Sequence, residues 1–479
     1  MNPIPTGRAG IQKPGARRSD SEERTGGSPG PSIQPMRSIT TTIILAGALF
    51  AQAQGPLSLS LQQAMDLAAK QSYNVRSSAL EAEKSIARSK EVTAIGFPQI
   101  NGKVELQNFI DVPTQLIPNF FTAPGSGGPE FIAAQFGVPW SLNAGVTLTQ
   151  LLFDGSYLVG VKAARELKTQ SNEDLQKTQA DARNQTAKAY FGALAAAEGS
   201  RLVSEGIPLL EKSLMEVTAM MDAGFMEQTD VDRLNIQLEQ ARSQKRNFDQ
   251  QVDVAKMLLA LTLGTPQGTP ITLTDKLENL LNDAGEIGLT EQPLDANSHI
   301  EQSSANTLVR LQELSVKADK AKALPSLGGF VSHSQVWNGP EFDPGGTYPF
   351  FPTTLWGLQL NVPIFSSGQR YHKVKQSQLA LEQVRINQTA TEQRLITMAE
   401  KQRTETRSAY DNFKTEERNL GLSKNIFDRT SIKFTNGSAA SFELTQEQGN
   451  YLIAQQTYIQ RMVELLIARA DLRKALDLY

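Results

Sequence analysis

Residues that could carry out bond chemistry are few in this 479-residue chain, and they are scattered. The chain has no cysteine, which excludes disulfides, thiol catalysis and cysteine-ligated metals. Its three histidines, His299, His333 and His372, lie far apart, whereas metal ligands usually cluster with short spacings. Neither a G-x-x-x-x-G-K phosphate loop nor an H-E-x-x-H motif occurs. We therefore expect no catalytic residue, no metal site, no cofactor and no enzymatic activity.

Charged residues are numerous, but they lie on long polar stretches, where they usually form a solvated face. The net charge of −3 indicates no bulk attraction to nucleic acid. The function must therefore be sought in the elements that the chain builds.

Two stretches show how the chain is organised, because each passes from a short strand into a very long helix. They run from Val146 to Lys168 and from Leu358 to Glu382. Gly155 and Gly368, at the two helix starts, lie 213 residues apart. The same offset relates further pairs: Val161 and Val374, Gly224 and Gly437, Leu259 and Leu472. We interpret this pattern as an internal tandem duplication.

The N-terminus has the features of an export signal. Residues 1–35 are rich in Pro, Gly, Ser and Arg and cannot build a core. Residues 36–53 combine Arg37, a short apolar run and an A-x-A cleavage site, as a signal peptide does. Residues 1–35 are then either a disordered extension or an over-called start before Met36. We expect an exported chain that begins near Gln54.

The exported chain divides into two repeats joined by a connector. The first repeat, 54–264, is expected to contain helices, a β-hairpin over 99–152 and a long helical hairpin over 155–263. The connector or equatorial segment covers 265–292. The second repeat, 293–479, is expected to contain a helix, a β-hairpin over 326–363 and a long helical hairpin over 367–477.

Each expected strand alternates apolar and polar residues over about ten positions, which suits a tilted transmembrane β-strand. A soluble, half-buried hairpin would have the same period. Tryptophans occur near the strand ends, as expected of membrane-interface aromatics: Trp140, Trp337 and Trp356. The helices carry only a narrow apolar stripe, close to a coiled-coil seam, so we expect them to pack side by side with water nearby.

An apolar-outside, polar-inside hairpin must belong to a closed barrel if it lies in lipid, because an open sheet edge finds no hydrogen-bond partners there. Four strands are too few to close a membrane barrel. The expected fold class is therefore mainly α with membrane β, in a barrel shared between chains and continued by helices outside the membrane.

The sequence resembles the TolC-like outer-membrane efflux protein family, the outer membrane factors of tripartite export systems. The resemblance covers about Pro56 to Leu476. It is carried by LSLQQAMDLAAKQ from Leu59, by a proline before a strand at Pro98 and Pro325, by VPIF-SSG from Val362 and by Asn436-Gly437 before SAASFELTQ. It implies a trimeric outer-membrane efflux duct, with a shared 12-stranded β-barrel and a long periplasmic α-helical barrel.

The resemblance also implies partners and a location. The homotrimer would lie in outer-membrane lipid of a Gram-negative bacterium. A periplasmic adaptor (membrane fusion) protein and an inner-membrane pump of RND, ABC or MFS type would deliver small molecules or proteins for export.

The resemblance further assigns roles to the two helix–helix turns. Adaptor-docking tips would comprise Ala223, Gly224, Asn436, Gly437 and Ser438. The periplasmic entrance or gate would comprise Glu443, Asp230, Phe434 and Gln446. Gln446 and Phe434 stand where relatives have an acid and a tyrosine, and Ala439 replaces a basic gate residue. Glu443 is explained equally well as a solvated acid at the start of a helix, where the helix dipole favours a negative charge, and as a gate residue.

Two other interpretations fit part of the sequence. An exported coiled-coil structural or adhesive protein would have the long helices but no use for four alternating strands. A periplasmic adaptor would have one helical hairpin flanked by soluble β domains rather than a tandem duplication.

Overall fold

The computed structural model describes residues 57–120, 129–281, 288 and 290–479. The expected extension (1–35) and signal peptide (36–53) lie outside these residues. Within the described chain, no helix is both long and apolar enough to cross a membrane.

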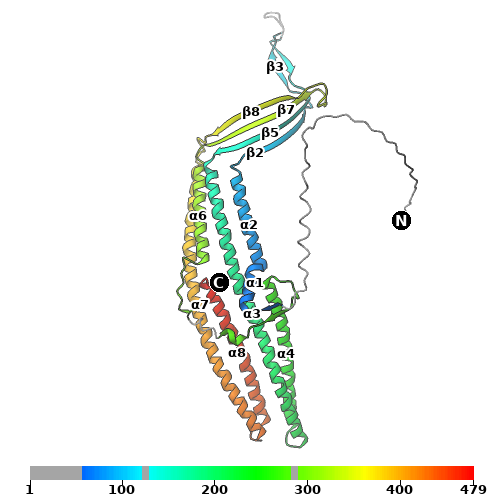
Figure 1. Cartoon of the computed structure of the whole chain (residues 1–479), viewed down its shortest axis with the longest axis vertical. Helices are drawn as coiled ribbons and strands as arrows, with labels where there is room; N and C mark the ends of the chain where they lie inside the picture. The colour runs from blue at the N-terminus through cyan, green and yellow to red at the C-terminus, as the bar shows by residue number, and fades with distance from the viewer. Residues whose placement is uncertain (1–56, 121–128, 282–287, 289) are drawn as a thin grey trace, which may run out of the picture. The chain divides into compact units, whose positions relative to one another are not determined.

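Four strands form one antiparallel sheet in the order β2 (Gln99–Asn108), β5 (Trp140–Phe153), β7 (Ser326–Gly339) and β8 (Phe351–Asn361) (Figure 1). The register pairs Ile100 with Leu148, Leu148 with Val331, and Val331 with Trp356. Because side chains alternate between the two faces of a strand, these residues share one apolar face across the whole sheet. The other face is polar, and on it the Thr147 and Ser332 hydroxyl oxygens lie 2.9 Å apart.

The sheet is open at both edges in the single chain. β2 and β8 each pair with one described neighbour only. The apolar face is also uncovered, because Val104 and Trp356 are 73% and 76% exposed.

The region between β2 and β5 contains a separate two-stranded ribbon. β3 (Thr114–Pro118) pairs antiparallel with β4 (Phe131–Gln135). Apolar side chains such as Leu116, Ile117 and Ile132 supply the strand preference in this region, although it is rich in Pro and Gly.

The helices pack in two tiers around two long ones, α3 (Gly155–Asp222) and α7 (Gln369–Thr435). Next to the sheet, α2 (Tyr73–Ala94) and α6 (Ile300–Ala321) complete the order α2-α3-α6-α7. Farther from it, the order is α4-α3-α8-α7, with α4 (Gln228–Leu263) and α8 (Ser441–Ala475) (Figure 1). The outermost helices of each tier, α2 and α7 in the first and α4 and α7 in the second, therefore pack against a neighbour on one side only within the described chain.

The main apolar core lies where α3 and α8 meet the short elements: β1 (Leu57–Leu59), α1 (Leu61–Gln71), β6 (Ile271–Leu273) and α5 (Leu277–Leu281). Tyr190 of α3 is fully buried at its centre. Its hydroxyl oxygen lies 2.9 Å from the Leu59 carbonyl and 3.1 Å from Asp275 Oδ2, and the same carboxylate oxygen accepts from the Leu61 amide at 2.7 Å. Burial, together with the nearby Asp275 carboxylate, raises the pKa of Tyr190 to about 12. One hydroxyl thus ties α3 to both the β1–α1 and the β6–α5 segments.

Replacing Tyr190 with Phe should lower the free energy of unfolding by about 1–2 kcal/mol, because the buried Leu59 carbonyl and the half-buried Asp275 carboxylate lose the hydroxyl donor that they share. Urea denaturation at pH 7 measures the change, with the exposed Tyr73→Phe as control. Since folding raises the Tyr190 pKa above that of the unfolded chain, its contribution is complete below pH 10 and is lost as pH rises towards 12. Equal stability of the two variants at pH 7 would contradict the assignment.

Candidate functional site

The turns of the two helical hairpins share one local geometry. Gly224 and Gly437 adopt left-handed backbone conformations, with φ of 80° and 69°. The amide of Gly224 donates to the carbonyl of Met221, and the amide of Phe225 donates to that of Met220. The last turn of α3 is therefore capped by two nested hydrogen bonds. Gly437 and Ser438 repeat the pattern on Phe434 and Lys433 at the end of α7. Glycine suits this position because a side chain there would strain the backbone.

An apolar cluster, here called the tip cluster, holds the two hairpins together just before these turns. It comprises buried residues from all four helices: Val217, Val231, Leu234, Phe427, Phe434 and Leu444. Phe434 is 4% exposed, and Phe427 stacks on Tyr451 with ring centroids 5.8 Å apart. Phe434 is therefore a packing residue of this cluster.

A polar contact crosses between the hairpins beside the tip cluster. Asp230 Oδ1 accepts a hydrogen bond from the Ser441 hydroxyl at 2.5 Å and lies 3.6 Å from the Arg233 guanidinium. Its other oxygen lies 3.4 Å from the Glu227 amide, at the start of α4. Arg233 also lies over the Phe442 ring, 5.6 Å from its centroid. The Asp230–Ser441 contact joins the first turn of α4 to the first residue of α8.

The structure separates the remaining entrance candidates from this contact. Glu443 and Gln446 are exposed on α8, whereas Asp230 is half-buried, so the offset that relates Asp230 to Glu443 does not give them the same surroundings. Ala439 packs against the tip cluster. Neither Ser441 nor Arg233 was singled out from the sequence. Arg233 lies one turn after Asp230 on α4, whereas only the packing of the hairpins brings Ser441 to Asp230.

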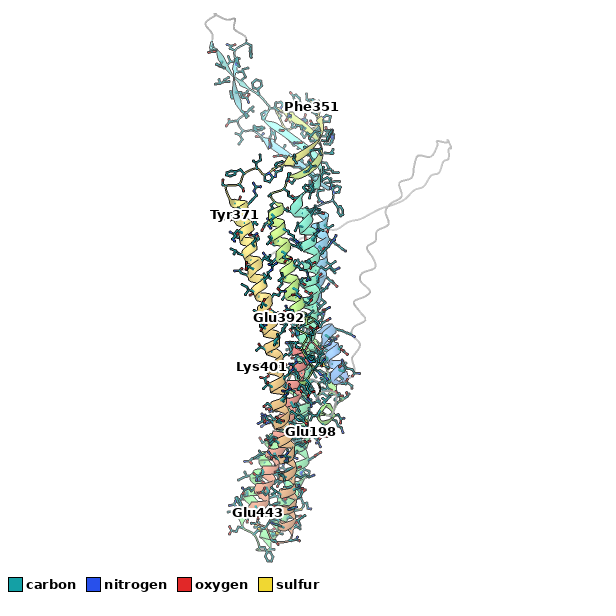
Figure 2. All side chains as sticks on the ribbon, turned by 90° about the vertical axis from the view of Figure 1, so that its left-hand side faces the viewer. Glu198, Phe351, Tyr371, Glu392, Lys401 and Glu443 are labelled. Atoms are coloured by element: carbon teal, nitrogen blue, oxygen red, sulfur yellow. The ribbon has the colours of Figure 1, made fainter. Side chains whose placement is uncertain are left out.

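The candidate docking residues lie together on the surface of the two turns. Ala223, Gly224, Asn436, Gly437 and Ser438 are all exposed. Two aromatic side chains accompany them, with Phe225 82% and Phe442 56% exposed. Figure 2 labels Glu443 at this end of the helices.

The three tryptophans of the sheet do not share one environment. Trp356 is exposed and Trp140 is partly buried, but Trp337 is fully buried. The Trp337 ring lies against Gly339, where any side chain would clash with it, and packs edge-on against Phe342 at 6.1 Å. Within this chain, therefore, Trp337 is a packing residue rather than an exposed aromatic.

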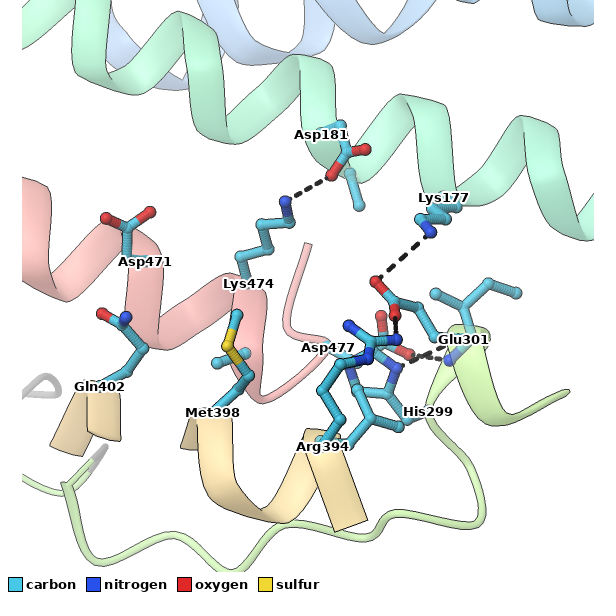
Figure 3. A pocket seen from close by; sticks show the side chains of 14 residues that line it. Lys177, Asp181, His299, Glu301, Arg394, Met398, Gln402, Asp471, Lys474 and Asp477 are labelled. Carbon is cyan, nitrogen blue, oxygen red and sulfur yellow. Dashed lines mark hydrogen bonds and ion pairs between the residues drawn. The ribbon is translucent and has the colours of Figure 1, made fainter. Parts of the chain in front are cut away.

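A charged cavity of about 300 Å³ lies where α6 and α8 meet end to end between α3 and α7 (Figure 3). Asp477, just after α8, accepts from the Ile300 amide at 2.9 Å, and His299 Nδ1 accepts from the Glu301 amide at 3.1 Å. Lys474 pairs with Asp181 at 2.7 Å. No group of residues in the described chain has the arrangement of a metal site.

Glu301 of this cavity pairs with two bases, Lys177 and Arg394. Burial disfavours its charged form, but the hydrogen bond from Arg394 and the nearby Lys177 outweigh burial and hold the pKa of Glu301 below its usual range. Together with the Lys474–Asp181 pair, the ion pairs of Glu301 join α3, α6, α7 and α8 in the middle of the helical region.

The chain matches the family model described as outer membrane efflux protein over residues 64–265 and 301–477. The chain belongs to the outer membrane efflux protein family. The two matched segments contain both long helical hairpins and leave out most of the connector.

Solved channels share the fold of this family member. CusC is 14% identical with a TM-score of 0.68, and the alignment covers 89% of this chain and 95% of CusC. Campylobacter jejuni CmeC is 14% identical with a TM-score of 0.64, covering 87% of this chain and 85% of CmeC. Neisseria gonorrhoeae MtrE, solved in an open state, is 16% identical with a TM-score of 0.62, covering 87% and 88%. No curated protein matches the sequence.

Gly437→Ala should lower the stability of the tip by about 1 kcal/mol, because a side chain is strained at positive φ. Gly421→Ala, on an exposed helical stretch of α7 with open space around it, should instead stabilise by up to about 1 kcal/mol. Hydrogen exchange of the last turn of α7 measures both changes. Changes of the same sign would contradict the role given to Gly437.

Proposed function

We propose that this efflux-family protein is an outer-membrane channel-tunnel that exports small molecules or proteins from periplasmic adaptor and pump complexes. One observation carries the proposal: a four-stranded sheet with an exposed apolar face, a polar opposite face and two unpaired edges. Such a sheet suits lipid only when its edges are closed by further strands. A coiled-coil rod without a pore would not need it.

Closure by copies of the same chain supports a homotrimer. Three chains with four strands each supply a 12-stranded barrel, in which β2 of one copy pairs with β8 of the next. The edge helices α4 and α7 carry exposed apolar residues that contacts with neighbouring copies would cover. On α4, Val254, Met257, Leu258 and Leu261 are exposed at helical spacing, on the side opposite Leu259 and Leu263 in the core. On α7, the exposed apolar residues include Leu379, Ile386, Leu422 and Ile426.

The helices would project from the outer membrane into the periplasm of a Gram-negative bacterium. An adaptor protein would dock on the exposed turn residues Ala223, Gly224, Asn436, Gly437 and Ser438. An inner-membrane pump of the RND, ABC or MFS type would supply the energy, because passage through a tube needs no bond chemistry. We find no role for nucleic acid.

The entrance would be controlled where the hairpins cross. The Asp230–Ser441 contact and the tip cluster around Phe434 would hold the two hairpins in the observed arrangement. Exposed Glu443 and Gln446 would line the entrance without holding it closed.

Purification tests the channel. The chain, expressed from Met36, should fractionate with outer membranes and require detergent. It should also migrate as a trimer and conduct ions in a planar bilayer. A water-soluble rod that needs no detergent would overturn the channel and favour the coiled-coil alternative.

Ser441→Ala and Asp230→Asn should each raise the open probability of the purified channel several-fold, because each weakens a hydrogen bond between the hairpins, and such a bond to a charged acceptor contributes about 1.5–3 kcal/mol. Glu443→Gln should leave opening unchanged and alter only cation preference. Single-channel recording measures both properties, with Asp253→Asn on exposed α4 surface as the charge-matched control. Opening raised by Glu443→Gln but not by Ser441→Ala would contradict the gate assignment.

A further inference from the structure

The distribution of basic residues changes abruptly where the sheet meets the helices. Across β2 to β5, Lys103 is the one basic residue from position 99 to 154, and it pairs with Glu105 at 2.6 Å. From 323 to 368 there is no Lys or Arg. The same two stretches contain six acids: Glu105, Asp111, Glu130, Asp154, Glu341 and Asp343.

The helix ends next to the sheet have the opposite charge. Eight basic residues lie in the ten helix residues closest to the sheet on each of α2, α3, α6 and α7: Arg88, Lys90, Lys162, Lys317, Lys320, Arg370, Lys373 and Lys375. Only three acids share these segments: Glu91, Glu313 and Asp319. Each of the three already pairs with a base, Arg88, Arg385 or Lys322, at 2.8 to 2.9 Å. These eight residues are here called the basic belt.

An exposed apolar rim runs between the basic belt and the sheet. It is formed at the points where the chain passes from helix to strand: Ile95, Phe97, Phe153, Leu324, Ile364 and Phe365. Phe365 is 85% and Ile364 90% exposed, and Tyr371 in the first turn of α7 is 70% exposed (Figure 2). Girdles of aromatic residues flank the apolar band of membrane β-barrels at both interfaces, and Tyr in particular favours the headgroup level.

Several residues of the basic belt are exposed and lie close enough to the apolar rim to contact a bilayer surface. Lys320, Lys373 and Lys375 are exposed, and they follow the apolar rim within about 10 Å, since a helix rises 1.5 Å per residue. Lysines just beyond an aromatic rim reach the depth of lipid phosphates with their aliphatic stems against apolar groups.

We propose that the basic belt binds anionic phospholipid headgroups of the leaflet that faces the helices. The inference rests on the proposed outer-membrane location and adds a lipid preference to it. Basic side chains attract an anionic leaflet within about a Debye length, and the acid-rich, base-poor sheet and its outer connections would not attract one. The preference would therefore be one-sided and would help to set the orientation and depth of the channel.

The test uses the detergent-purified full chain reconstituted into bilayers of phosphatidylcholine alone or mixed with phosphatidylglycerol. Native mass spectrometry then measures the ratio of the two lipids retained by the oligomer. The wild type should retain phosphatidylglycerol in excess over its share of the bilayer. That excess should fall from about 0.1 M to about 1 M salt, as the Debye length shortens from about 10 Å to about 3 Å.

The triple variant Lys320→Gln, Lys373→Gln, Lys375→Gln should reduce the excess about fivefold or more. The matched control, Lys212→Gln, Lys401→Gln, Lys424→Gln, removes the same charge from exposed helix surface far from the sheet and should retain the wild-type ratio. Circular dichroism and oligomer size show that both variants fold.

The outcomes separate this inference from the proposed function. A chain that enters bilayers but retains no excess of phosphatidylglycerol, or loses it equally in both triple variants, overturns the lipid preference alone. A chain that enters neither bilayer overturns the proposed function and this inference with it.

Discussion

The polar seam along α3 is the interaction on which the helical region depends. α3 contacts helices of both tiers, and its residues spaced three or four apart meet partners at matching heights on α6 and α8. Arg310 pairs with Glu166, Ser304 with Gln170, Ser303 with Glu173, Glu301 with Lys177, Lys474 with Asp181, and Asp471 with Asn184 and Lys188. Burying such groups costs desolvation, and Gln170 and Glu173 each keep one side-chain oxygen without a partner among the described residues. The seam fixes how far α3 is shifted along α6 and α8, because each polar group meets its partner at one position along the helix. Apolar surfaces alone would allow the helices to shift past one another.

After Lys188, the buried face of α3 is apolar rather than polar, and the two tiers of helices divide at this change. Tyr190, Phe191 and Leu194 join the main core, and Gly199 lets the Phe248 ring of α4 approach the helix backbone closely. The core near α1 provides stability, and the tip cluster provides a second, smaller apolar contact about twenty residues farther along. Stability and register are thus supplied by different parts of one helix.

The features that could be predicted from the sequence were those set by local periodicity. Alternation predicted the apolar face of the sheet, and the observed register confirms that Ile100, Leu148 and Val331 share it. The family assignment, predicted from loose motifs, is confirmed by the family match. Features that depend on contacts between distant segments were not predictable. The Trp337 ring is buried because Gly339 leaves space for it, and Ser441 reaches Asp230 only because the hairpins pack together. Neither relation leaves a periodic signal.

The two strand–helix units are alike in layout but unlike at the points where their shorter helices meet. At the end of α4, Gly264 adopts φ of 70° and packs so closely on Gln71 and Ser72, where α1 ends and α2 begins, that no side chain would fit. At the matching place after α8, Asp477 adopts φ of 56°, a conformation that L residues rarely take. Its carboxylate caps α6 beside a cavity lined by paired charges. The first junction is therefore held by backbone packing that salt does not weaken, and the second by charge pairs that salt does weaken. Similar architecture thus gives two helical hairpins whose ends are joined differently, and the junction after α8 adds charge pairs to the apolar packing that α8 already contributes to the main core.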